Sequence, residues 1–193
     1  MNVFYTNSNP ITCAEEHCHV HRIKMILEYA QLLSTTHRVL ACPEPVEVYV
    51  WKNRRLTKKT KWHMHPTDTV RYRFGIMIVT ATKLYNATHM NHPSAVWVRS
   101  AEQHYKWLLQ CLLALLAEHL THKTWNKVQY LAKPPEGMST EYNIEPPQAM
   151  PDEFKQSDTT LAYQAYLNHK FDQWLADGKR PATFDTTPAW RIQ

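Results

Sequence analysis

A histidine, a lysine and a glutamate stand one helical turn apart in the first quarter of the chain. His21, Lys24 and Glu28 follow one another at intervals of three and four, and Gln31 continues the series. Side chains so spaced share one face of an α-helix. A lysine that has lost its proton is a nucleophile, and a neighbouring carboxylate can move protons or stabilise an oxocarbenium-like centre. Attack of this amine on a sugar C1′ would give a Schiff base. The plainer alternative is an ordinary i,i+4 ion pair, which contributes only about 0.2–0.5 kcal/mol.

These side chains need a helix, and the sequence predicts a long one from Thr12 to Arg38. Thr12 followed by Glu15 has the spacing of a capping box. Apolar residues recur at helical spacing on both sides of the polar line, so we expect that line to face a cleft and not open water.

A basic segment follows this helix. Residues 41–84 hold nine basic and three acidic residues, whereas the whole chain has a net charge of +5. Alternation predicts two strands, 46–51 and 70–80, which would form a β-ribbon within an insertion at 44–82. Basic side chains can neutralise phosphates while aromatic ones stack on bases; the alternative is a solubilising hairpin without a partner. The predicted aromatic contacts are Trp51, Trp62 and Tyr72. The predicted nucleic-acid-binding residues are Arg54, Arg55, Lys58, Lys59, Lys61, Arg71 and Arg73.

Later segments could close the cleft. A polar connector at 85–99 carries His92, Trp97 and Arg99, which with Gln31 are the predicted substrate contacts. The helix that follows the connector is apolar nearly all round from 107 to 116, which predicts a central core helix. Residues 134–153 form a proline-rich loop, and 157–176 read as a last helix.

Composition favours a mainly α fold. The chain has 193 residues with three glycines and twelve prolines, few glycines for a fold with many tight turns. We therefore expect one compact helical domain, residues 1–193, with the β-ribbon as an insertion. No apolar run is long enough to cross a membrane, and the start has no secretory pattern. The four cysteines lack paired spacing, so we expect a cytoplasmic protein with no membrane partner.

Metal chemistry is a further alternative, and no cofactor is expected. His17 and His21 share a helix face and could bind a metal with other histidines, but the glutamate of an HExxH motif is missing. The sequence has no glycine-rich phosphate loop and no GxSxG motif.

Two motifs give the chain a resemblance. The pattern H-x-x-K-M-x-x-E-x-x-Q-x-L runs from His21 to Leu33, and N-H-P-x-x-x-W-x-R runs from Asn91 to Arg99. The chain thereby resembles a group of small, poorly characterised phage proteins over most of its length except 41–84. More remotely, it is similar to phage pyrimidine-dimer DNA glycosylase/AP lyases, small all-helical enzymes whose first helix carries a histidine and, seven residues later, a catalytic glutamate.

That remote similarity implies a glycosylase or lyase in which Glu28 is the acid/base residue. Enzymes of that family use an N-terminal amine exposed by removal of methionine, but residue 2 here is asparagine, which usually blocks that removal. The flanking arginines of the family have no clear match either. The amine could come from Met1 or from Lys24, or the chemistry could differ.

The leading hypothesis is therefore a phage enzyme that acts on nucleic-acid bases or sugars in the host cytoplasm. Its catalytic residues would be Glu28, Lys24 and His21. DNA, RNA and a free nucleotide remain alternative substrates, with DNA first. The second hypothesis is a non-enzymatic protein that binds nucleic acid or a host protein through the ribbon. The third is a metal-dependent hydrolase that uses the histidines.

Overall fold

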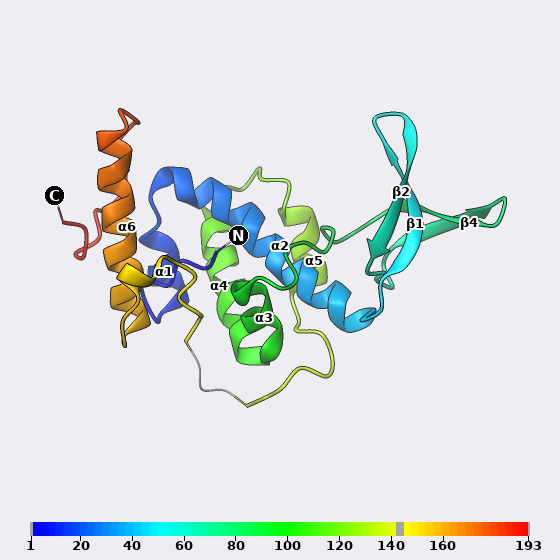
Figure 1. Ribbon diagram of the computed structural model, residues 1–193, viewed down its shortest axis with the longest axis horizontal. Helices are drawn as coiled ribbons and strands as arrows, with labels where there is room; N and C mark the ends of the chain where they lie inside the picture. The colour runs from blue at the N-terminus through cyan, green and yellow to red at the C-terminus, as the bar shows by residue number, and fades with distance from the viewer. Residues whose placement is uncertain (1, 142–144, 193) are drawn as a thin grey trace.

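The computed structural model describes residues 2–141 and 145–192 (Figure 1). Their helices are α1 (Pro10–Glu15), α2 (His19–Ala41), α3 (Pro93–Ser100), α4 (Glu102–Ala117), α5 (Trp125–Leu131) and α6 (Thr159–Ala176), with a 3-10 turn η1 (Asp152–Phe154). Their strands are β1 (Val46–Lys52), β2 (Arg55–Trp62), β3 (Thr69–Arg73) and β4 (Ile76–Ala81).

The helix predicted from Thr12 to Arg38 is in fact two helices, α1 and α2. The Asn9 side chain caps α1 by accepting the backbone N–H groups of Ile11 and Thr12, and Pro10 occupies the first turn. The predicted capping box at Thr12 was therefore wrong. The chain is extended at Cys18, and α2 begins after it.

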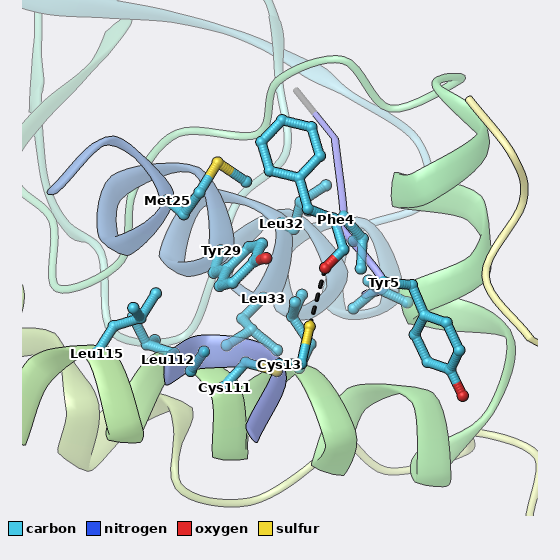
Figure 2. Packing of buried hydrophobic residues seen from close by; sticks show 14 of the residues in the cluster. Phe4, Tyr5, Cys13, Met25, Tyr29, Leu32, Leu33, Cys111, Leu112 and Leu115 are labelled. Atoms are coloured by element: carbon cyan, nitrogen blue, oxygen red, sulfur yellow. Dashed lines mark hydrogen bonds between the residues drawn. The ribbon is translucent and has the colours of Figure 1, made fainter. Parts of the chain in front are cut away.

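The helical core lies between α2, α4, α1 and the N-terminal segment 2–9, which precedes α1 (Figure 2). Tyr29 and Leu33 of α2 are buried near Leu112 of α4. The Cys13 thiol of α1 donates to the Phe4 carbonyl at 2.9 Å. Fully burying a leucine side chain contributes about 1.5–3 kcal/mol, so this interface is the main source of stability for the helical body.

The most apolar helix, α4, lies in this core as the sequence predicted, with Leu108, Leu112 and Leu116 fully buried. Among the described residues, no helix combines the length and the apolar composition that crossing a bilayer requires.

The strands form one four-stranded mixed sheet in the order β2-β1-β4-β3. Each outer strand pairs with its inner neighbour as an antiparallel hairpin, and the inner strands β1 and β4 pair in parallel. Figure 1 shows the sheet beyond the C-terminal end of α2, where the two hairpins splay apart.

The prediction of a mainly α domain with a two-stranded ribbon was wrong, because the protein combines its helices with a four-stranded sheet. Residues 55–62, rich in lysine and threonine, were expected to be a connection but form β2 along the length of β1. The predicted strand 70–80 is a hairpin that turns at Phe74 and Gly75. Strand formation here depends on pairing and half-burial more than on residue type.

A buried ion pair fastens the sheet to α2. Arg38, near the end of α2, makes two hydrogen bonds to Asp68, of 2.7 and 2.8 Å, and both side chains are fully buried. The guanidinium also donates to the backbone carbonyls of His63 and Tyr85, and the Trp62 indole donates to Asp68. A bidentate pair fixes orientation as well as distance, so the sheet is held in one geometry against the helix.

Candidate functional site

Glu28 is the centre of the site that the sequence predicted on α2. Its side chain is 16% exposed, and one carboxylate oxygen lies 3.5 Å from Lys24 Nζ. The other oxygen accepts the backbone N–H of Asn2 at 3.2 Å. Lys24 itself is exposed. The carboxylate is thus fixed from two sides at the edge of the core.

Asn2 ties three distant segments together beside this carboxylate. Its amide group donates to the Ala149 carbonyl at 2.9 Å, and its Oδ1 lies 3.1 Å from the Tyr163 hydroxyl. The same hydroxyl lies 2.8 Å from the Pro147 carbonyl and accepts the Ala149 N–H. Part of the proline-rich loop and the start of α6 therefore lie beside Asn2 and the Glu28 carboxylate.

A second lysine, Lys170 of α6, joins the site. Its ammonium nitrogen lies 5.7 Å from the ring centres of both Phe4 and Tyr166. Burial lowers the pKa of Lys170, the charge of Lys24 lowers it further, and Glu28 opposes the change. A lysine with a lowered pKa offers more neutral amine at a given pH and is the better nucleophile.

Sequence reasoning missed Lys170, although a signal was available. Lys170 follows Tyr166 by four residues and Tyr163 by seven, so the three share one face of α6. An amine aligned with two tyrosines on the face that packs against the body could have been recognised as a candidate.

His21 lies next to the site but in the core. Its ring packs against Phe4 at 4.8 Å, Trp174 at 5.4 Å and Phe171 at 5.6 Å between centroids. Burial lowers the pKa of His21 to about 3, with help from the positive charges of His17 and the two lysines. The ring is therefore neutral at neutral pH and enclosed by aromatic side chains, which does not suit the catalytic role predicted for it.

His92 approaches Glu28 from the connector. It caps α3 by accepting the Ser94 N–H at 3.2 Å and is half-buried. Burial lowers its pKa, and the Glu28 charge acts in the opposite direction, which places the two groups within electrostatic reach. The connector runs along α2 because the Thr88 N–H donates to the Thr35 hydroxyl at 3.2 Å. Gln31 is half-buried, one turn after Glu28.

The structure does not bring Trp97 and Arg99 into this cluster. Trp97 is buried and stacks on His104 with ring centres 4.5 Å apart, beside a cavity of about 210 Å³ that Tyr5 and Trp107 also line. The Arg99 guanidinium donates to the Met90 carbonyl at 2.5 Å and holds the connector. Both residues have structural contacts of their own in place of the predicted substrate contacts.

The histidine pair proposed for a metal is engaged within the protein. His17 has both ring nitrogens in hydrogen-bond contact, one with the Cys13 carbonyl at 2.6 Å and one with the Tyr29 hydroxyl at 2.9 Å. His21 sits among aromatic rings. In the described part of the chain, no three histidine, cysteine or acidic side chains are grouped as metal ligands.

The basic residues of the sheet are divided between its two faces. The register sets Lys58, Tyr49, Ile78 and Arg71 in one row across all four strands, and Arg73 lies two residues further along on the same face. Lys58 is partly neutralised by Glu47 at 2.8 Å. Arg55 and Lys59 are an odd number of residues from Lys58 along β2, so they lie on the opposite face of the sheet. Arg54 lies in the β1–β2 turn.

Two of the predicted aromatic contacts, Trp51 and Tyr72, are exposed, but Trp62 is not. Trp62 packs with Val48 and Val79 in the small core of the sheet. Its predicted stacking on bases was therefore wrong. Lys61, next to it, is exposed.

Comparison with protein-family models, curated proteins and solved structures finds no match for the chain.

Proposed function

We propose that the protein is an enzyme of the glycosylase or lyase type that acts on a nucleic-acid sugar through an amine beside Glu28. The observation that supports it best is the position of Lys170, which is half-buried beside the Phe4 and Tyr166 rings and within electrostatic reach of the fixed Glu28 carboxylate. An amine nucleophile and a carboxylate that can move protons are what such chemistry needs.

The chemistry begins with the neutral amine and C1′ of an abasic deoxyribose in its open aldehyde form. The amine nitrogen bonds to C1′, one water leaves, and a Schiff base results. The Glu28 carboxylate then takes a proton from C2′, and the C3′–O bond breaks with release of the 3′ phosphate. On an intact nucleotide, the same attack would displace the base from C1′.

Three amines are candidates for the attacking group. Lys170 is half-buried with a lowered pKa, and Lys24 is exposed and paired with Glu28. Met1 lies outside the described residues, and its neighbour Asn2 bonds to Glu28. We rank Lys170 first because burial favours its neutral form.

Borohydride trapping on a single-stranded abasic oligonucleotide tests this proposal. Wild type should give a covalent adduct that Lys170→Met abolishes and Lys24→Met only weakens. Lys155→Met is the matched control, since Lys155 is an exposed lysine paired with Asp152. An adduct that survives in the Lys24/Lys170 double variant would move the assignment to the N-terminal amine. Absence of any adduct in wild type would remove the amine chemistry.

Glu28→Gln separates the carboxylate from the amine. The substitution keeps the size of the side chain and removes its charge, so strand cleavage should fall about 10²–10⁴-fold while folding is retained. Cleavage at the wild-type rate would show that Glu28 is only a structural anchor for Asn2.

The projecting basic sheet favours a second candidate, a nucleic-acid-binding protein without catalysis. Neutralising Arg54, Arg55, Lys58 and Lys59 distinguishes the two. In the enzyme, this change should weaken substrate affinity and leave the maximal rate unchanged. In a pure binding protein, wild type and variant alike should give no adduct, and the change should abolish nucleic-acid binding.

A further inference from the structure

The tip of the β3–β4 hairpin carries a phenylalanine in a strained position. Arg73 pairs with Ile76, so the turn has two residues, Phe74 and Gly75, with φ of 50° and 76°. Positive φ at both residues defines a type I′ turn, which favours asparagine or glycine at the first position. A bulky side chain there is a genuine outlier and is costly in the left-handed region.

The strain is not compensated by burial. Phe74 is 89% exposed, so its ring lies almost wholly outside the fold. The Arg73 guanidinium stacks over the ring at 5.1 Å from its centre. A residue that is strained and exposed adds nothing to the core, which points to a role in contact with a partner.

The charge of the sheet as a whole points to a polyanion as that partner. Residues 51–75 contain eight basic residues and one acidic residue, Asp68. Asp68 is buried against Arg38, so it does not offset the surface charge. Arg71 and Arg73 flank the tip on one face. The β1–β2 turn, which exposes Trp51 beside Arg54, lies at the other end of the sheet, because β1 and β4 run parallel. Basic and aromatic side chains together suit the phosphates and bases of nucleic acid.

We propose that Phe74 is a wedge that inserts between stacked base pairs of a nucleic-acid duplex, with Arg71 and Arg73 on the flanking phosphates. Apolar side chains inserted in this way unstack a base step and kink the duplex, so that it contacts more protein surface. The inference rests on the proposed function in taking nucleic acid as the partner, and it adds that the partner is a duplex and is bent.

The wedge and the carboxylate cannot act on the same nucleotide. Ten residues of α2 separate Glu28 from Arg38, about 15 Å along the helix. From Asp68, beside Arg38, six further residues of extended chain lead to Phe74, about 20 Å along the strand. The wedge therefore bends the duplex at a distance, and it does not itself extrude the base that reaches Glu28.

Phe74→Asn is a sharp test because it should stabilise the hairpin while removing the ring. It creates an Asn-Gly turn, the preferred type I′ sequence, so the Tm should stay constant or rise by about 2–4 °C. Binding to a duplex of about 30 base pairs, measured by fluorescence anisotropy, should weaken about tenfold. Energy transfer between dyes on the two duplex ends should report bending by wild type and none by the variant.

Two variants serve as controls. Phe74→Tyr keeps the ring and should bend the duplex as wild type does. Leu120→Asn replaces a residue that is 76% exposed between α4 and α5, and it should change neither binding nor bending.

Other outcomes would overturn the inference. A Phe74→Asn variant that binds and bends the duplex like wild type would refute the wedge, and so would an equal loss of affinity for single strands and duplexes. A further test uses vesicles of phosphatidylserine and phosphatidylcholine. If the protein bound these vesicles through Phe74 and did not bind the duplex, the partner would be a membrane surface. Trapping on the single-stranded abasic oligonucleotide separates the two proposals: a missing adduct with intact bending refutes the enzyme alone, and an intact adduct without bending refutes the wedge alone.

Discussion

Replacing His21 with methionine should make the protein more tolerant of acid. The His21 side chain is 3% exposed, and its ring is surrounded by Phe4, Phe171 and Trp174. Burial lowers its pKa to about 3, whereas the unfolded chain has the ordinary histidine value of about 6.5. Methionine fills a similar space with an apolar, adaptable side chain.

The sign and the size of the effect follow from proton binding. Below about pH 6.5 the unfolded chain binds a proton at His21 and the folded chain does not, so stability falls as the pH drops toward 3. At pH 5 the loss from this one group is about 2 kcal/mol, since a pKa difference of one unit corresponds to about 1.4 kcal/mol and about 1.5 units lie between pH 5 and 6.5.

Urea unfolding at pH 8 and pH 5 measures this contribution. Between the two pH values, His21→Met should lose about 2 kcal/mol less of its free energy of unfolding than wild type. His169→Met, a change at an exposed histidine, should behave like wild type. If His21→Met kept the full pH dependence, or if the His21 ring titrated near pH 6.5 by NMR, the aromatic burial would not hold the ring neutral. The catalytic role predicted for His21 from the sequence would then be open again.

Three further predictions concern the amine, the anchor and the sheet. The rate of adduct formation should rise with pH to a midpoint below the ordinary lysine pKa, and Lys24→Met should move that midpoint upward by removing a positive charge near Lys170. Asp68→Asn should cost about 3–5 kcal/mol in chemical unfolding, because it leaves the Arg38 charge buried and unpaired. Arg73→Ala should reduce the slope of log affinity against log salt by about one in a titration with duplex.

The arrangement on α2 was predictable because it depends on local geometry alone. Four residues are little more than one helical turn, so a helix that contains Lys24 and Glu28 brings them together wherever it ends. The same spacing predicted a polar His21 but not its surroundings. Those come from α6 and the N-terminal segment 2–9, which no pattern within α2 encodes.

The rest of the site was not predictable for a related reason. Asn2 and Lys170 approach Glu28 from opposite ends of the chain, and their positions depend on how α6 and the N-terminal segment 2–9 pack.

The sheet was underestimated because β2 carries few apolar residues. Its pairing with β1 supplies the backbone hydrogen bonds, and its polar side chains remain in solvent.

The Glu28 site and the sheet that carries Phe74 are both attached to the helix α2. Glu28 lies in the middle of this helix, and Arg38 fastens the sheet near its end through a pair of buried hydrogen bonds. A buried, bidentate ion pair leaves little freedom for the sheet to swing relative to the helix. A bend that Phe74 introduces would therefore have a fixed direction relative to Glu28. Loosening the anchor at Asp68 should then impair the use of long duplexes while sparing short single strands, which do not need the sheet.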